Sequence, residues 1–257
     1  MKKRKIIGIV MTCLLSASAL ICGGIFLHQD RDVRSSAAAF DELAGMVAEV
    51  TLPELSEPEG DAPPASEAEL AQEKYGALFA QNSDFVGWIS IDGTGINYPV
   101  MQTPDHPDYY LKHGFDKAYS NYGVPYIDEA CSSGLSNNIV IYGHHMNDGS
   151  MFADLCGYAD RDFWVEHKTI HFDTLFAFGE YEVMAAFRFN ANRDTFRYNE
   201  YTNMDEAEFA EFLENVRARA LYDTGAEVEY GDTLLTLSTC EYTYRNGRFV
   251  VVAKKVN

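Results

Sequence analysis

A thiol, an imidazole and two guanidinium groups lie near the ends of strand-like segments. Together these kinds of side chain can carry out thiol chemistry. Cys240 ends one such segment, His144 follows another, and two arginines, Arg245 and Arg248, come shortly after the cysteine. The thiolate is the reactive form of cysteine, and a nearby imidazole or positive charge favours it. A guanidinium can also stabilise the oxyanion that forms on an attacked carbonyl group. These residue types therefore indicate acyl transfer through a thiolate.

The choice between the two arginines depends on how the last two strands pair. If the segment 249–256 pairs antiparallel with the segment 233–240, Arg248 opens the return strand and lies across from Cys240. Arg245 then falls within the connection and is less constrained. We favour Arg248 and keep Arg245 as the alternative.

The elements that must position these residues are mostly short strands. Runs with strand-like composition occupy residues 86–91, 96–100, 124–127, 138–142, 169–172, 181–189, 233–237 and 249–256. Helical patterns occupy residues 37–50, 151–167 and 204–220, and Ser66 is a plausible helix start. Pro99 places its strand at a sheet edge or a bulge. Many short strands with few helices predict a mainly β fold built as a β-barrel or closed sheet.

The amino-terminal part has a different character from the rest. Residues 1–5 form a basic tail and residues 6–27 an uncharged apolar run, which is long enough for a transmembrane helix. The basic tail favours a cytoplasmic amino terminus, so the bulk of the chain is expected outside the cytoplasm. Residues 28–68 are expected to form a membrane-proximal helix and an acidic, proline-rich spacer, followed by a catalytic domain at 69–257. A cleaved signal peptide, with small residues at 16–19, is the alternative.

Charge argues against one class of function, nucleic-acid binding, and the cysteine content indicates a free thiol. The formal net charge is −19, and such an acidic chain repels nucleic-acid backbones. Cys131, Cys156 and Cys240 lie beyond the apolar run, so this odd number predicts at least one free thiol. Pairing of Cys131 with Cys156 stays open.

Two motifs together resemble the active-site strands of class B sortases. One is Tyr-Gly-His at 142–144 with Met-Asn-Asp-Gly-Ser-Met-Phe at 146–152, and the other is Thr-Leu-Ser-Thr-Cys-Glu at 236–241 with a following arginine. The similarity runs from about Tyr75 to the end of the chain. It implies an eight-stranded sortase-type β-barrel with N-terminal helices and one long helix between late strands.

The resemblance also implies roles for individual residues. The catalytic residues fall on His144, Cys240 and Arg248. Strand alternation allows only one of the adjacent histidines to face a given site, and the family pattern selects His144 over its neighbour. Substrate contacts fall on Tyr142, Ser238 and Glu241. No metal or organic cofactor is implied.

The expected function is that of a single-pass, membrane-anchored extracytoplasmic cysteine transpeptidase. Such an enzyme cleaves a sorting-signal peptide of secreted surface proteins after Thr, through a thioacyl-enzyme. It then transfers the product to an amine, either of a peptidoglycan precursor or of a pilin lysine. A thiol peptidase that releases its product by hydrolysis is one alternative, and a non-catalytic membrane-tethered binding module is another.

Two other readings of the cysteines and histidines are weaker. A papain-like protease has its cysteine early in the chain and its histidine far downstream, whereas this chain has the reverse order. His167 and His171 have helical spacing for a zinc site but lack an accompanying glutamate motif.

Overall fold

The computed structural model describes residues 31–52, 65–132, 136–243 and 245–256. The chain divides into two compact units, residues 1–42 and 43–257. In the first unit, residues 31–42 are helical, and this helix ends at residue 49. Within the described ranges, no helix combines the length and apolar character that crossing a membrane requires. The predicted span at 6–27 lies outside the described residues.

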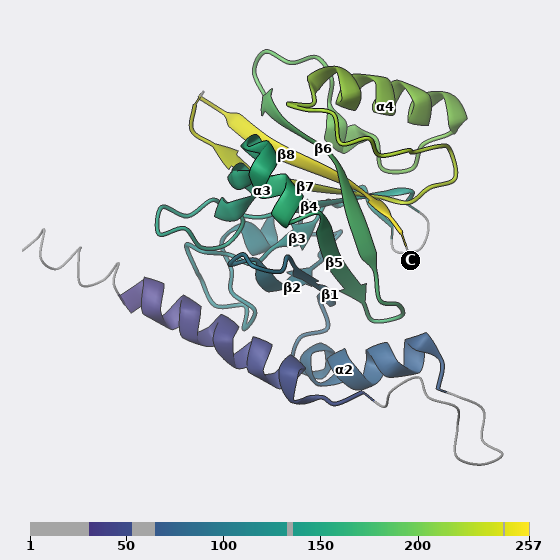
Figure 1. Cartoon of the computed structure of the whole chain (residues 1–257). Coiled ribbons are helices and arrows are strands. Elements are labelled where there is room, and N and C mark those ends of the chain that lie inside the picture. Colours follow the sequence, from purple (N-terminus) through teal and green to yellow (C-terminus); the bar gives the residue numbers. More distant parts are fainter. Residues whose placement is uncertain (1–30, 53–64, 133–135, 244, 257) are drawn as a thin grey trace, which may run out of the picture. The chain divides into compact units, whose positions relative to one another are not determined.

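Eight strands of the second unit close into a barrel, with the order β1-β2-β3-β4-β7-β8-β6-β5 (Figure 1). The strands are β1 (Phe85–Ser90), β2 (Asn97–Met101), β3 (Tyr126–Ile127), β4 (Asn138–Tyr142), β5 (Thr169–Thr174), β6 (Glu180–Asn190), β7 (Leu234–Glu241) and β8 (Gly247–Lys255). The helices are α2 (Glu67–Gln81), α3 (Arg161–Glu166) and α4 (Glu206–Arg219), with 3-10 helices η1 (Tyr109–Leu111), η2 (Ala153–Ala159) and η3 (Tyr198–Glu200). The predicted fold class is confirmed.

The apolar run at 233–237 is only part of its strand. The strand β7 continues through Cys240 to Glu241 because β8 pairs with it along its whole length, which agrees with the pairing expected for 233–240. The position of Pro99 differs from the sequence-based expectation. Pro99 lies inside a closed barrel and not at an edge, although the β1–β2 pair has a register shift between Phe85 and Gly87, opposite the residues that follow Pro99. It is tolerated there because β2 pairs with β3 only at Met101, so no strand partner on that side needs a Pro99 amide.

One cluster of the hydrophobic core lies between the β6-β8-β7 side of the barrel and the helix α4. Phe209, Phe212 and Val216 on one face of α4 share an apolar cluster with Val250 and Val252 of β8. Asp205 caps the start of α4 by accepting a hydrogen bond from the amide of Glu208. Figure 1 shows α4 lying along this side of the barrel, between β6 and β7 in the chain. The predicted long helix between late strands is therefore present.

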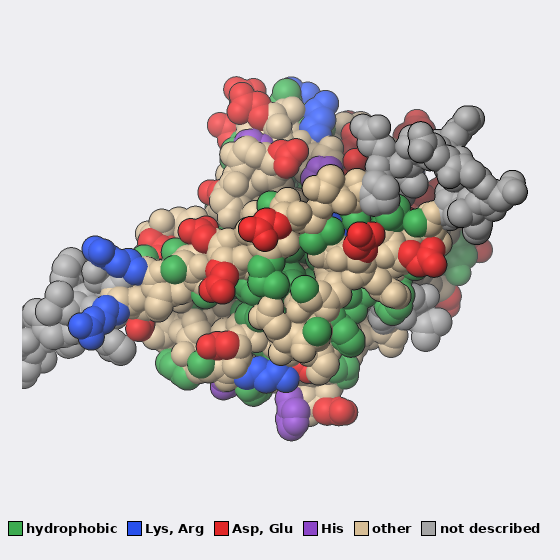
Figure 2. All heavy atoms as spheres, turned by 90° about the horizontal axis from the view of Figure 1, so that it is seen from below, with side chains coloured by type: hydrophobic (Ala, Val, Ile, Leu, Met, Phe, Trp, Pro, Cys, Tyr) green, Lys and Arg blue, Asp and Glu red, His purple; other side chains and the backbone are tan. Residues whose placement is uncertain are grey.

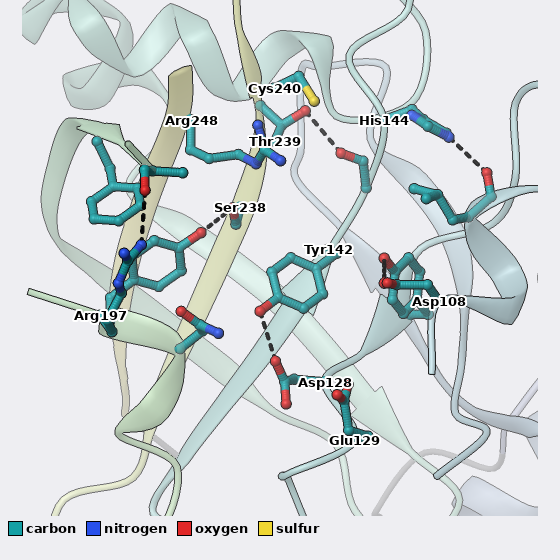
Figure 3. A pocket seen from close by; sticks show the side chains of 17 residues that line it. Asp108, Asp128, Glu129, Tyr142, His144, Arg197, Ser238, Thr239, Cys240 and Arg248 are labelled. Atoms are coloured by element: carbon teal, nitrogen blue, oxygen red, sulfur yellow. Dashed lines mark hydrogen bonds between the residues drawn. The ribbon is translucent and has the colours of Figure 1, made fainter. Parts of the chain in front are cut away.

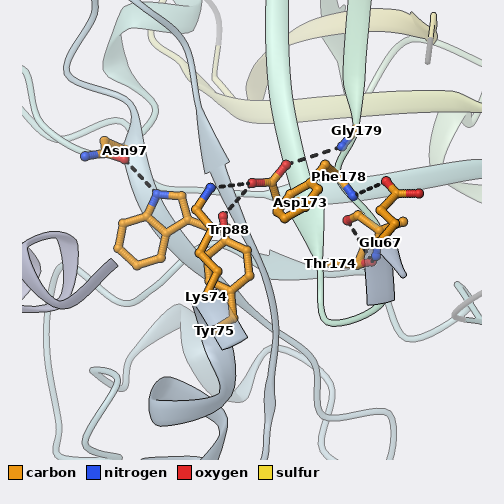
Figure 4. A network of polar contacts seen from close by, with 10 residues as sticks. Glu67, Lys74, Tyr75, Trp88, Asn97, Asp173, Thr174, Phe178 and Gly179 are labelled. Carbon is orange, nitrogen blue, oxygen red and sulfur yellow. Dashed lines mark hydrogen bonds and ion pairs between the residues drawn. The ribbon is translucent and has the colours of Figure 1, made fainter. Parts of the chain in front are cut away.

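The helix α2 is fastened to the barrel by polar contacts (Figure 4). Asp173 of β5 accepts a hydrogen bond from the Tyr75 hydroxyl at 2.5 Å and pairs with the Lys74 ammonium at 3.1 Å. At the start of α2, Glu67 accepts a hydrogen bond from the Phe178 amide at 2.7 Å. Ser66 caps the helix in a capping box with Glu69, as its position before two acidic residues predicts.

The surface carries the acidic character that the composition predicts. Figure 2 shows acidic side chains scattered over one face of the molecule, with few lysines and arginines among them. The same face has small apolar areas between the acids. The acidic side chains on this face repel a phosphate backbone.

Candidate active site

The parallel pair of β4 and β7 brings the two motifs of the sequence side by side. Tyr142 is paired with Ser238 at the end of β4, and the Gly143 amide donates to the Ser238 carbonyl at 3.1 Å. The Thr239 hydroxyl in turn donates to the Gly143 carbonyl at 2.9 Å. A Cβ atom on Gly143 would lie 2.5 Å from the Phe152 ring, so only glycine fits this crossing. His144 and Cys240 therefore lie at the neighbouring ends of the paired strands β4 and β7.

The antiparallel pair of β7 and β8 places Arg248 directly opposite Cys240. The turn between these strands includes Asn246, whose φ of 59° suits the left-handed conformation that asparagine tolerates. The guanidinium of Arg248 donates through Nη1 to the carbonyl of Gly247 at 3.0 Å, which orients the end of its side chain. Arg245 is exposed within the turn.

The His144 ring is held from the opposite wall of the site. Its Nε2 lies 2.7 Å from the carbonyl oxygen of Leu111, and a carbonyl oxygen only accepts, so Nε2 carries a proton. The other nitrogen, Nδ1, is left to exchange protons. Burial lowers the pKa of His144, and the nearby positive charge of Lys112 adds to this, while the bond to Leu111 opposes it.

A cavity of about 390 Å³ connects these residues. Figure 3 shows Cys240, Arg248 and His144 at one end and the carboxylates of Asp128 and Glu129 at the other. Cys240 is partly exposed, so its thiol is accessible from this cavity. The full lining consists of Asp108, Leu111, Tyr126, Asp128, Glu129, Tyr142, Gly143, His144, Phe189, Ala191, Arg197, Tyr198, Asn199, Ser238, Thr239, Cys240 and Arg248.

Two of the three residues expected to contact substrate line this cavity. The Tyr142 hydroxyl donates to Asp128 at 2.7 Å, and burial raises the pKa of Tyr142 far above its usual value. The Ser238 hydroxyl lies at the buried base of the cavity, 2.7 Å from the Tyr198 hydroxyl.

The third expected substrate contact, Glu241, is not part of the cavity lining. Its carboxylate accepts a hydrogen bond from the Thr243 amide at 3.0 Å and lies 3.6 Å from Arg188. Strand alternation explains this placement, because Glu241 is one residue beyond Cys240 and points to the other face of the sheet. A substrate role for Glu241 stays a prediction.

Sequence reasoning missed several residues of the cavity. Leu111, Asp128 and Tyr198 come from segments between the strands, where no periodic pattern marks them. Tyr198 is buried, and burial raises the pKa of its hydroxyl, which the nearby Ser238 and Arg248 oppose. The only available signal was the aromatic content of the segment around Tyr198.

The three cysteines among the described residues are free thiols. Cys131 is buried, and burial raises its pKa to about 12. Cys156 is half-buried, and burial together with nearby Glu241 raises its pKa to about 11. The pairing of Cys131 with Cys156 that the sequence left open does not form.

A thiol, an imidazole and a guanidinium at one cavity of a closed eight-stranded barrel define a cysteine acyltransferase. The family model described as the sortase domain matches residues 89–256. Sortase B of Listeria monocytogenes is 36% identical over 178 residues, which cover 68% of this chain and 71% of that protein. The chain therefore belongs to the sortase family, in its class B, and is a cysteine transpeptidase.

Solved structures agree with this assignment. A Staphylococcus aureus sortase B–substrate complex has a TM-score of 0.73 at 26% identity, covering 88% of this chain and 99% of the other. A sortase B complexed with triglycine has a TM-score of 0.74 at 26% identity, covering 87% of this chain and 99% of the other. The predicted family and enzyme class are confirmed.

Proposed function

We propose that this sortase cleaves a sorting-signal peptide of secreted surface proteins after a threonine and joins it to an amine. The observation that carries the proposal is the convergence of His144, Cys240 and Arg248 on one cavity from three different strand ends. The cavity has a volume of about 390 Å³ and is lined by Cys240 and His144 and by the carboxylates of Asp128 and Glu129. Related sortase B structures hold a substrate and triglycine, which supports a peptide donor and an amine acceptor.

In the first half-reaction, the Cys240 thiolate attacks the carbonyl carbon of the threonine. The electron pair of the carbonyl moves to oxygen, and the guanidinium of Arg248 stabilises this oxyanion. Collapse of the intermediate breaks the C–N bond, and His144 gives its Nδ1 proton to the departing amine. Burial makes the His144 imidazolium a stronger acid by lowering its pKa, which favours this transfer. A thioester on Cys240 remains.

In the second half-reaction, the acceptor amine attacks the thioester carbon and gives a proton to Nδ1 of His144. The C–S bond breaks and the Cys240 thiolate is restored. The product is an amide that links the surface protein to a peptidoglycan precursor or to a pilin lysine. If water takes the place of the amine, the same steps give hydrolysis.

The remaining chain serves to place this domain outside the cell. In our proposal residues 1–5 stay in the cytoplasm, residues 6–27 span the membrane once, and residues 28–68 form a helix and spacer. The catalytic domain at 69–257 then works at the cell surface, where sorting signals emerge. The apolar run and its basic flank support this arrangement.

The test is cleavage of a library of short peptides that each contain one threonine, with and without triglycine as acceptor. We expect cleavage after threonine, a covalent adduct on Cys240 by mass spectrometry, and a ligated product when triglycine is present. Replacement of Cys240 by Ala should abolish both adduct and cleavage, whereas Cys131→Ala, which removes a buried thiol, should retain them. Cleavage by the Cys240→Ala variant would refute the nucleophile. Cleavage without ligation would favour the peptidase alternative.

A further inference from the structure

The pairing between β4 and β7 stops just before it reaches the catalytic residues. The last residue pair is Tyr142 with Ser238, followed by one more bond from the Gly143 amide to the Ser238 carbonyl. In a parallel ladder the next acceptor on this edge of β7 is the carbonyl of Cys240, two residues on. The matching donor would be the amide of His145. The backbone of His145 has turned away, however, and forms a bridge with Met151.

The side chain of His145 takes the position of the missing amide. Its Nδ1 lies 3.1 Å from the Cys240 carbonyl oxygen. Since that oxygen only accepts, Nδ1 carries the proton and donates it. The thiol sulfur of Cys156 lies 3.4 Å from the same Nδ1 and shares this proton as a weak acceptor. The ladder thus gains one side-chain hydrogen bond at the nucleophile itself.

The His145 ring is fixed in this orientation by the segment that follows β7. The Tyr242 ring meets it edge-on, with 5.1 Å between ring centroids and an interplanar angle of 69°. The Tyr242 hydroxyl also donates to the His145 carbonyl at 2.9 Å. Together with the bond from Thr239 to Gly143, these contacts tie both neighbours of His144 to β7 and the segment after it. His144 itself is left facing the cavity.

We propose that His145 is a positioning residue of the transfer reaction, acting through the backbone of Cys240. Its Nδ1–H bond to the Cys240 carbonyl fixes the end of β7 against the end of β4. The distance between the Cys240 thiol and the His144 ring is thereby held constant through both half-reactions. The proposal rests on the proposed transpeptidation, and it assigns His145 no proton transfer of its own. Its ring is needed for the shape and the donor, not for its charge.

Two substitutions of His145 distinguish the effect of its hydrogen-bond donor from that of a charge on its ring. In His145→Asn, the side-chain amide nitrogen can occupy the place of Nδ1 and still donate, but the side chain no longer titrates. In His145→Ala, the donor is lost. A matched control is His167→Ala. Nδ1 of His167 also donates to a backbone carbonyl, that of Asp92 at 2.8 Å, and like His145 the residue His167 does not line the cavity.

The first measurement is steady-state cleavage of the library peptide that the wild-type protein cleaves fastest. Since a displacement of about 1 Å can cost about 10²-fold in rate, we expect His145→Ala to lower kcat at least tenfold with KM within about twofold. His145→Asn should keep at least about a third of the wild-type kcat, and His167→Ala should stay within about twofold. Equal losses in the Ala and Asn variants of His145, or an equal loss in His167→Ala, would overturn the proposal.

The second measurement needs no substrate. A long-range ¹H–¹⁵N spectrum of the imidazole groups of the wild-type protein should show His145 with its proton on Nδ1. A proton on Nε2 alone would remove the donor and overturn the proposal. If no library peptide is cleaved but the Nδ1 proton is present, the proposed function fails while the hydrogen bond at Cys240 stands.

Discussion

At the scale of single residues, the planar shape of the Arg248 guanidinium matters as much as its positive charge. It lies opposite Cys240 across the β7–β8 pair and lines the cavity, whereas Arg245 is exposed in the turn. The guanidinium is a planar fork that can donate to an oxyanion and to a peptide carbonyl together, and a lysine ammonium cannot reproduce this geometry. The role of Arg248 should therefore be sensitive even to a change that keeps the positive charge.

We predict that Arg248→Lys lowers kcat for peptide cleavage by about 10²-fold with little change in thermal stability, because oxyanion stabilisation of this kind contributes that much. Stopped-time cleavage assays measure kcat, and thermal denaturation of the same preparation measures stability. Arg245→Ala is the matched control and should leave kcat nearly unchanged. If Arg245→Ala causes the larger loss, the other arginine carries the role.

At the scale of elements, the site depends on strand pairs that are themselves held by the rest of the barrel. The strand β5 pairs with β1 and β6, and its Asp173 fastens the helix α2. Tyr75 is 1% exposed, and Asp173 accepts the hydrogen bond of its hydroxyl. This contact is remote from the cavity lining. It should therefore affect stability and leave the chemistry intact.

We predict that Asp173→Ala lowers the free energy of unfolding by about 1–3 kcal/mol, because a buried hydroxyl then lacks its partner. The kcat of the folded fraction should be unchanged. Urea unfolding followed by tryptophan fluorescence measures the first quantity. Asp92→Ala is the control, since Asp92 is exposed and its pairing with His171 at 3.9 Å is worth at most about 1 kcal/mol. Equal effects of the two substitutions would contradict the role of Asp173.

At the scale of the whole molecule, the burial of His144 links the active site to the pH dependence of folding. Burial lowers the pKa of His144 in the folded protein below its value in the unfolded chain, about 6.5. Between these two values the unfolded state binds more protons than the folded state. The free energy of unfolding therefore falls as the pH drops below about 6.5.

We predict that His144→Asn makes this fall smaller, because the variant has no imidazole to protonate on unfolding. Urea titrations of wild-type and variant protein at about pH 7.5 and about pH 5.5, chosen to lie on either side of about 6.5, give the difference. His106→Asn, at an exposed histidine, is the control. A variant that loses as much stability as the wild type over this range would contradict a lowered pKa.

The sequence by itself predicted a β-barrel or closed sheet and placed Cys240 at the end of a strand. A run of β-branched and aromatic residues is a local signal, so β4 was recognised at residues 138–142 as the structure has it, and the other strands within a few residues. The two motifs are also local, which is why the family could be inferred from them. The pairing of Arg248 with Cys240 followed from the order of the last two strands.

Only the tertiary structure decided which remote segments complete the site. The Leu111 carbonyl at His144, the Tyr198 hydroxyl at Ser238 and the ring of His145 at Cys240 each join parts of the chain that no local pattern connects. Glu241 shows the same limit, because its ion pair with Arg188 of β6 comes from the packing of its face of the sheet, whereas its bond to Thr243 is local. Local patterns specify backbone conformation, whereas the partners of a side chain are set by how the barrel closes.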